Sequence, residues 1–446
     1  MLDKKEKKAF FKTLIGLSIP IMLQEMLNSS VNMVDVLMIG SLGIEAVAAV
    51  GLANQIFFLF ILLCFGIVSG SSIFTGQFYG KGDLAGVHKV MGICFVATTA
   101  GAAFFATGAI FFPQFLMRIY SNDETVIELG ASYLRIIGFS YFFTAITASI
   151  NAALRSIGQT KFPMITTMVA LFMSVSLNYV FIFIFEMGVA GAALGTLSAR
   201  IVEILLQIFI IFKFKLPVAA PFRSYFVADK DFIKTFFKTT APVILNEVVW
   251  ATGVSLYQIA YKYVGMEAQG AMQIASTVQN LFMVIGMAVG TSCGIMLANL
   301  LGAGEHQKAI QYSRKCLGLV VFFSMGMGIV LILCTPVIVT LFEISDEVKQ
   351  SLTNIIYVVA LGMPFKTFAY TTIVGILRSG GDTKFCLMLD SGTVWLIGVP
   401  CAFFSAIVLQ WPIHFVFATV YIEEIVKCAI SGHRVWKNKW ARTLVN

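Results

Sequence analysis

Long apolar runs, separated by short polar breaks, extend through the whole sequence. Each run holds about 20 to 30 residues, which is enough for an α-helix to cross the hydrocarbon layer of a bilayer. The pattern therefore predicts twelve membrane-spanning helices. They are expected at residues 14–38, 47–75, 90–113, 126–152, 162–185, 190–212, 233–261, 268–298, 315–341, 350–376, 384–409 and 411–433.

The composition agrees with a membrane protein and excludes a large soluble domain. Of the 446 residues, 58% are apolar and 12% are charged, whereas soluble domains carry about 25% charged residues. Twelve spans use nearly the whole chain and leave no room for a catalytic head. The histidines and Gly80-Lys-Gly82 do not form the signatures of hydrolases or phosphate-binding enzymes. We therefore expect no enzyme activity, no cofactor and no nucleic-acid partner.

Lys and Arg are distributed unequally between alternate connections. One set of connections, together with the two termini, holds 24 of these residues, and the other set holds only Arg118, Lys262 and Lys349. Cytoplasmic loops carry the excess of Lys and Arg. The distribution therefore predicts a multi-pass protein of the plasma (inner) membrane with both termini in the cytoplasm.

The sequence repeats itself with a period of 222 to 223 residues. The segment 154–162, Leu-Arg-Ser-Ile-Gly-Gln-Thr-Lys-Phe, returns at 377–385 with seven of nine residues identical. Two further residue types recur in the same register, as Pro20 with Pro242 and Glu25 with Glu247. One register kept over such a distance indicates a duplicated lobe.

Each repeat contains six predicted helices, so both halves enter the membrane in the same direction and are related by an axis along the membrane normal. The expected fold is an all-α membrane protein with two pseudo-symmetric six-helix lobes, at residues 1–212 and 233–446, joined by a cytoplasmic linker at 213–232. Two matched bundles around a central interface are typical of a transporter, because rocking one bundle on the other exposes the interface to each side in turn.

The first predicted helix carries a polar stripe. Its members are Glu25, Asn28, Asn32 and Asp35, which fall within an arc of about 80° at 100° per residue. Charged side chains inside a span usually line a cavity or have a partner. A carboxylate among amide oxygens can bind a sodium ion, and a buried carboxyl can bind a proton. The alternative interpretation is a hydrogen-bond network that fixes helix packing.

The repeat-equivalent face of the seventh predicted helix carries Glu247, Trp250 and Tyr257. Aromatic rings beside a carboxylate suit an organic cation, which gains cation–π attraction and charge pairing. These three residues are the predicted substrate contacts. Trp and Tyr are equally suited to packing or to anchoring at the membrane interface.

Other charged residues lie inside the predicted spans. Lys366 and Asp390 share a lobe with Glu247 and form either a proton relay or a neutralising network. Within single helices, we expect Arg200 to neutralise Glu203 and Glu423 to neutralise Lys427. The arginines of the two repeated loops, Arg155 and Arg378, are expected to cap helix ends.

Several of these residues carry a family resemblance. Pro20 is followed fifteen residues later by Asp35, within the segment Asn32-Met-Val-Asp-Val-Leu-Met-Ile-Gly40. Together with the two Leu-Arg-Ser-x-Gly-x-Thr-Lys motifs and Gly188-Val-Ala-Gly-Ala-Ala193, this segment resembles the multidrug and toxic compound extrusion (MATE) family.

The resemblance implies twelve helices in two lobes and export of cationic, often aromatic compounds in exchange for protons or sodium ions. It carries the family's acid in the first helix over to Asp35. The chain departs from the pattern in the seventh helix, where Trp250 occupies the position of an acid found in many members and Glu247 lies one turn earlier.

The predicted function is therefore secondary active antiport of organic cations or drugs by a monomer in a lipid bilayer. The coupling ion is H⁺ or Na⁺, and sodium at Asp35 is the one metal ion considered. The alternatives are a lipid-linked sugar flippase of similar architecture, which favours a cationic cavity, and an ion channel, which favours repeated filter segments or charged rings.

Overall fold

The computed structural model describes residues 4–342 and 344–445, apart from the side chains of Asn32 and Met266. Within these residues the chain is helical and has no strands. The side chain of Asn32, which belongs to the predicted ion site, therefore lies outside the described residues.

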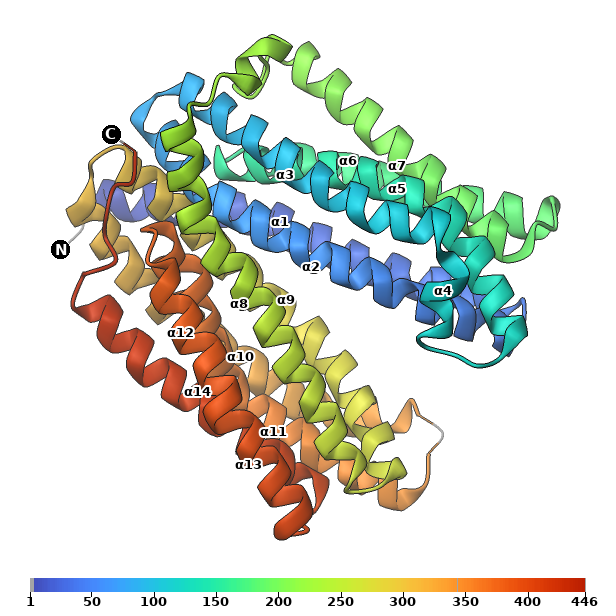
Figure 1. Ribbon diagram of the computed structural model, residues 1–446. Helices are drawn as coiled ribbons and strands as arrows, with labels where there is room; N and C mark the ends of the chain where they lie inside the picture. Colours follow the sequence, from blue (N-terminus) through green and yellow to red (C-terminus); the bar gives the residue numbers. More distant parts are fainter. Residues whose placement is uncertain (1–3, 343, 446) are drawn as a thin grey trace. The chain divides into compact units, whose positions relative to one another are not determined.

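Helices follow one another along the chain with short connections (Figure 1). In the first half they are α1 (Lys4–Gly40), α2 (Ile44–Lys81), α3 (Leu84–Phe111), α4 (Pro113–Arg118), α5 (Glu124–Ser156), α6 (Lys161–Tyr179), η1 (Val180–Ile184), α7 (Gly188–Lys213) and η2 (Phe222–Phe226). In the second half they are α8 (Lys230–Lys262), α9 (Met266–Gly302), α10 (His306–Thr340), α11 (Asp346–Tyr370), η3 (Thr371–Leu377), α12 (Thr383–Thr393), η4 (Val394–Gly398), α13 (Val399–Phe403), η5 (Phe404–Val408) and α14 (Ile413–Trp436).

All twelve predicted spans coincide with helical segments, which confirms the all-α fold. Within the described residues, eleven of these segments are long and apolar enough to cross a membrane. The twelfth is α14, whose 24 residues include Glu423, Glu424 and Lys427. These charges reduce its mean hydropathy, although Glu423 and Lys427 are buried inside the protein.

The chain forms two compact units, and the boundary between them falls inside two helices. The N-terminal unit is Leu23–Ile244, and the C-terminal unit contains the described residues of Met1–Met22 and Leu245–Asn446. The boundary follows Pro20 in α1 and Pro242 in α8 by two residues. The predicted lobes followed the sequence repeat, whereas the compact units divide α1 and α8 internally.

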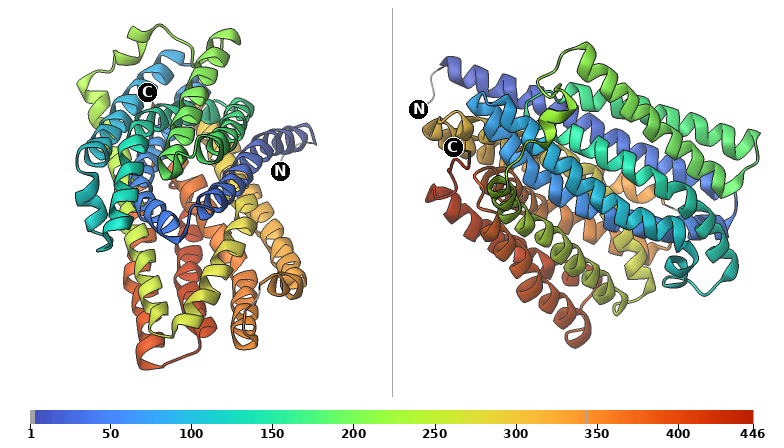
Figure 2. Two further views of the ribbon diagram at one scale, coloured as in Figure 1. Left: turned by 90° about the vertical axis from the view of Figure 1, so that its right-hand side faces the viewer. Right: turned by 45° about the horizontal axis from the view of Figure 1, so that its top comes forward.

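In the N-terminal unit α2, α3 and α5 pack side by side, and α7 packs against α5 and α6, as the views in Figure 2 also show. Alanines supply much of the contact surface. Ala49, Ala102, Ala109 and Ala193 are fully buried in one apolar core. Small side chains allow membrane helices to approach closely.

In the C-terminal unit α9, α10 and α11 pack together, and α14 packs on α11. Gly290 and Gly294 of α9 lie against the backbone of Gly375 in η3, so closely that a Cβ at either α9 position would approach η3 within about 3 Å. Glycine is required there because two helix backbones share the space.

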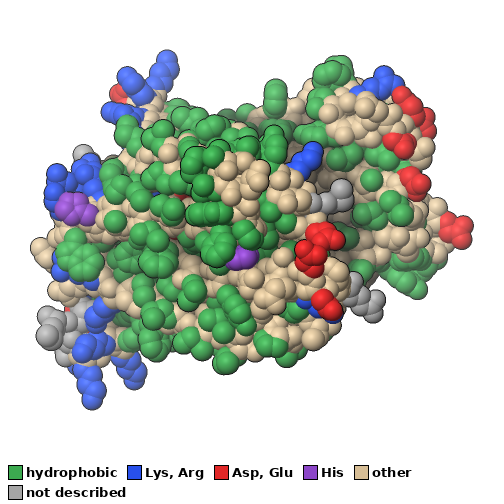
Figure 3. All heavy atoms as spheres, turned by 90° about the horizontal axis from the view of Figure 1, so that it is seen from below, with side chains coloured by type: hydrophobic (Ala, Val, Ile, Leu, Met, Phe, Trp, Pro, Cys, Tyr) green, Lys and Arg blue, Asp and Glu red, His purple; other side chains and the backbone are tan. Residues whose placement is uncertain are grey.

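Hydrophobic side chains cover much of the surface visible in Figure 3. Large apolar groups such as Phe104, Phe322 and Leu396 are more than two-thirds exposed. Such exposure is expected where helices face lipid in place of water.

The fifth predicted span of each lobe ends in the same way. In each, a π-helical segment, η1 or η5, is followed two residues later by a non-glycine residue with positive φ, Glu186 at 52° and Gln410 at 51°. These positions are separated by nearly the repeat period, so the repeat extends to local backbone geometry. π-Helical turns are rare and frequently occur near functional sites.

Candidate ion and substrate sites

Asp35 of α1 is held by an amide from α6. Asn178 Nδ2 donates a hydrogen bond of 3.0 Å to Asp35 Oδ1. Asn178 is 2% exposed, and a Cβ at Gly195 of α7 would overlap its Oδ1. Gly195 therefore makes the space in which the amide lies against the carboxylate.

The amide oxygen of Asn178 has an unsatisfied acceptor. Oδ1 is buried and receives no hydrogen bond from the described residues. Buried acceptors without a donor are rare and mark a place where water or an ion belongs. A carboxylate beside a free amide oxygen provides the hard oxygen ligands that sodium prefers, and the same carboxyl group can carry a proton.

Glu25 occupies a different place on α1. It lies ten residues before Asp35, which corresponds to about 15 Å along the helix. Arg155 of the first repeated loop approaches it, with Nη2 at 3.4 Å from Glu25 Oε1 and 2.6 Å from Gln24 Oε1. Asn28 is half-buried between the two acids. The predicted polar stripe is therefore two separate sites.

A chain of polar contacts continues from Gln24 into the N-terminal unit. Gln24 Nε2 donates to Thr167 Oγ1 at 2.8 Å, and Thr167 Oγ1 donates to Glu203 Oε1 at 3.0 Å. Arg200 Nη1 lies 2.8 Å from Glu203 Oε2. The ion pair predicted for Arg200 and Glu203 is confirmed, and it balances the buried glutamate.

Glu247 of α8 has a close counter-ion. Arg378 Nη2 donates to Glu247 Oε1 at 2.8 Å, and the two side chains are 3% and 11% exposed. Arg155 and Arg378 were expected to cap helix ends, and that prediction missed the ion pairs that both arginines form. A substrate cation would have to compete with Arg378 for Glu247.

The aromatic residues predicted on α8 have different surroundings. Tyr257 is 5% exposed, and its hydroxyl donates to Glu423 Oε2 of α14 at 2.6 Å. Trp250 is half-buried and packs against the apolar core of the C-terminal unit. Of the three predicted substrate contacts, Trp250 is the one not engaged in a polar contact listed among its neighbours Glu247 and Tyr257, and all three roles stay predictions.

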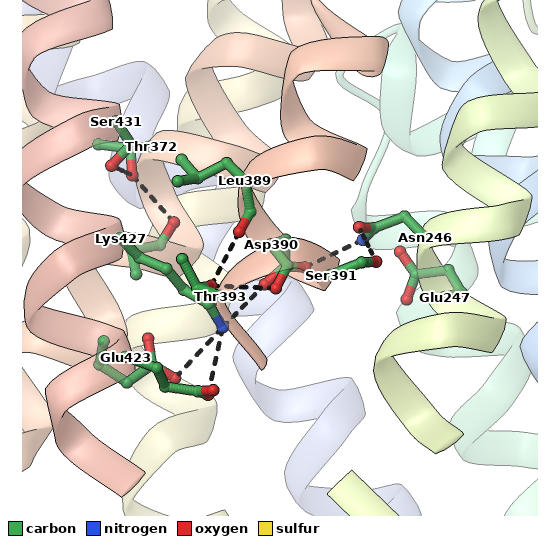
Figure 4. A network of polar contacts seen from close by, with 12 residues as sticks. Asn246, Glu247, Thr372, Leu389, Asp390, Ser391, Thr393, Glu423, Lys427 and Ser431 are labelled. Carbon is green, nitrogen blue, oxygen red and sulfur yellow. Dashed lines mark hydrogen bonds and ion pairs between the residues drawn. The ribbon is translucent and has the colours of Figure 1, made fainter. Parts of the chain in front are cut away.

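Asp390 of α12 lies at the centre of the polar network drawn in Figure 4. Lys427 Nζ lies 2.9 Å from Asp390 Oδ1, and Asn246 Nδ2 donates to Asp390 Oδ2 at 3.0 Å. Lys427 also lies 3.4 Å from Glu423, which confirms the pair predicted within α14. Lys366 interacts electrostatically with Glu424, Lys427 and Glu423. Its role in a relay with Asp390 stays a prediction.

The two units build related networks from repeat-equivalent positions. The contact from Gln24 to Thr167 corresponds to the contact from Asn246 to Asp390, with each residue displaced by 222 or 223 positions. In both units the next residue of the same helix is a glutamate bound by the loop arginine. The retention of both charges in both repeats was the sequence signal for these pairs.

The comparisons with known proteins agree with this architecture. The chain matches the MatE family over residues 20–180 and 242–404, two segments that correspond to the two repeats. The uncharacterized transporter YisQ of Bacillus subtilis is 23% identical over 447 residues, which cover 98% of this chain and 96% of that protein. The probable multidrug resistance protein NorM of Thermotoga maritima is 25% identical over 415 residues, covering 90% of this chain and 87% of that protein.

Solved structures show the same fold. A mutant of the Vibrio cholerae MATE transporter VcmN aligns with a TM-score of 0.90 at 19% identity, over 97% of this chain and 98% of that one. With the family match extending over both repeats, the chain belongs to the MatE family of multidrug and toxic compound extrusion transporters. It is an integral, multi-pass membrane protein.

Proposed function

We propose that this transporter exports organic cations in exchange for protons or sodium ions, and that Asp35 binds the coupling ion. The observation that carries the proposal is the contact of Asp35 with Asn178, whose buried amide oxygen lacks a donor. Multidrug resistance proteins among the relatives favour drug export over the flippase and channel alternatives.

The physical role of Asp35 follows from its charge. An ion that binds the carboxylate more tightly in one conformation shifts the equilibrium between outward-facing and inward-facing states by that difference in affinity. Each charge that moves down the membrane potential supplies about 2.3 kcal/mol per 100 mV. Glu25 is less suited to this role because Arg155 already lies 3.4 Å from its carboxylate.

Trp250 is the residue that we assign to the substrate. Its partly exposed ring can attract an organic cation by about 0.5–2 kcal/mol. Glu247 and Tyr257 act in the same region through the groups they hold, since one pairs with Arg378 and the other donates to Glu423. We further propose a monomer in the plasma membrane with cytoplasmic termini.

Transport by purified protein in proteoliposomes tests the function. Ethidium, an aromatic organic cation, is enclosed with the transporter, and a proton gradient or a sodium gradient is imposed separately. Ethidium movement driven by one gradient identifies the coupling ion. Absence of driven movement under both gradients, with several other organic cations also inactive, would contradict the proposed antiport.

A further inference from the structure

The buried charges of the C-terminal unit do not balance. Lys427 faces three carboxylates, with Nζ at 2.9 Å from Asp390, 3.4 Å from Glu423 and 3.9 Å from Glu424. Lys366 adds a second positive charge through its interactions with Glu424 and Glu423. Three acids against two lysines leave one negative charge in excess when all five groups are ionised.

The neighbouring ion pairs do not compensate for this excess. Glu247 is matched by Arg378, and Asp382 is matched by Arg434 at 2.8 Å. In the N-terminal unit the corresponding buried acid, Glu203, is matched by Arg200. An uncompensated buried charge is costly, and a buried acid ordinarily takes up a proton in preference to remaining charged.

Hydrogen bonds show which of the three acids is least stabilised as a carboxylate. Asp390 receives Lys427 on one oxygen and the Asn246 amide on the other. Glu423 receives Lys427 on one oxygen and the Tyr257 hydroxyl on the other. Glu424 has Lys427 at 3.9 Å and receives no hydrogen bond from the described residues, although its side chain is only 13% exposed.

The groups that face Glu424 come from three helices. From α8, α11 and α14 they are Tyr257, Lys366, Tyr421, Glu423, Lys427 and Cys428. The two lysines favour the ionised form of Glu424, whereas Glu423 and burial oppose it. Because Lys427 is shared with two nearer carboxylates, its effect on Glu424 is divided.

The backbone is shaped around these acids. Gly398 ends the π-helical segment η4, and a Cβ at this position would overlap both the Tyr257 hydroxyl and the Glu423 carboxylate. The absent side chain therefore makes room for the hydrogen bond between Tyr257 and Glu423. π-Helical turns are found frequently at functional sites, and this one fixes Glu423 so that Lys427 cannot be given to Glu424 alone.

We propose that Glu424 carries a proton at neutral pH and is a second proton site of the transporter, in the C-terminal unit and separate from Asp35. With the proton on the carboxyl group, the five charges sum to zero. Loss of the proton to water leaves a carboxylate and a net charge of −1, which an arriving cation can balance. The role of the site in transport rests on the proposed antiport, whereas its protonation does not.

Infrared spectroscopy of the purified protein tests the protonation directly. The Asp35→Asn background removes the other proposed proton site, and Glu424→Gln is added to it. The C=O stretch of a protonated carboxylic acid is expected at neutral pH in the Asp35→Asn protein and is expected to disappear in the double variant. The exposed Glu128→Gln is the matched control and should leave the band unchanged. An identical band with and without Glu424 would overturn the proposal.

A conservative variant guards against a folding defect. Glu424→Asp keeps an acid, so the band should move in frequency and remain present, and a spectrum unchanged from the parent would again count against Glu424. Transport then separates the two proposals. If wild-type protein moves ethidium under a proton gradient, Glu424→Gln should reduce the number of protons exchanged per ethidium. An unchanged proton number would overturn a coupling role for Glu424, whereas a wild-type protein without driven transport would overturn the antiport.

Discussion

Arg378 Nη2 lies 2.8 Å from Glu247 Oε1, and this ion pair joins the second repeated loop to α8. Glu247 is the third residue after the boundary between the two units. The same relationship recurs in the first repeat, where Arg155 lies 3.4 Å from Glu25, also the third residue after the boundary. Each repeated loop therefore fixes the helix at the point where the chain enters that loop's own unit.

The two ion pairs should differ in their contribution to stability. Arg378→Gln leaves the buried Glu247 carboxylate without its counter-ion and should destabilise the protein by about 3–5 kcal/mol. Arg155→Gln affects a pair whose side chains are 24% and 44% exposed, for which about 0–1 kcal/mol is expected. Thermal unfolding of both variants in one detergent gives the order. Equal shifts would contradict the distinction, and Glu247→Gln added to Arg378→Gln should recover part of the loss.

Gly195→Ala should disable the Asp35 site without touching Asp35. A Cβ at this position overlaps Asn178 Oδ1 and displaces the amide from the carboxylate. A hydrogen bond to a charged group contributes about 1.5–3 kcal/mol, so gradient-driven efflux should fall by about tenfold or more. Gly51→Ala is the control, because a Cβ there meets nothing within 4 Å. Wild-type efflux by the Gly195 variant would show that Asn178 is dispensable.

Substrate affinity should depend on Trp250 more than on Tyr257. Trp250→Ala removes a partly exposed ring and should weaken ethidium binding by about 0.5–2 kcal/mol, or roughly 2- to 30-fold. Tyr257→Phe removes a hydroxyl that donates to Glu423 inside the unit, so ethidium affinity should remain close to that of the wild type. Fluorescence titration of both variants decides the matter. The reverse order would restore the predicted substrate contact of Tyr257.

The predicted orientation in the membrane can be tested by labelling. Single cysteines at the exposed positions Asn122 and Asp346 should react with impermeant reagents added outside the cell. Cysteines at Lys81 and Glu305, which are exposed in loops of the other set, should not react. A cysteine-free background is needed because the chain contains eight cysteines. Labelling from outside at Lys81 and Glu305 would reverse the proposed topology.

The sequence alone predicted the positions of the helices well, because each span is a long apolar run whose ends are marked by polar residues. Even α14 was predicted, despite Glu423, Glu424 and Lys427, since apolar residues flank these charges. The π-helical turns were not predicted. A π-turn adds a residue to the helix without changing its composition, so hydropathy gives no sign of it.

The partners of the site residues were predicted less well. The pairs Glu25 with Arg155 and Glu247 with Arg378 are separated by 130 and 131 residues, and helix packing brings each pair together. The recurrence of both charges in both repeats was a usable signal. Asn178, 143 residues from Asp35, has no equivalent signal, because a single amide in an apolar span is also compatible with packing. Pairs within one helix, such as Arg200 with Glu203, follow directly from helical spacing.

The central claim is that Asp35 couples an ion gradient to export. Asp35→Asn keeps the size of the side chain and its capacity for hydrogen bonding but removes the charge. The decisive measurement is ethidium efflux from proteoliposomes that contain folded wild-type or Asp35→Asn protein, under a proton gradient and a sodium gradient in turn. The account predicts driven efflux by the wild type under at least one gradient and its collapse in the variant under both. Efflux by Asp35→Asn at near wild-type rates would contradict it.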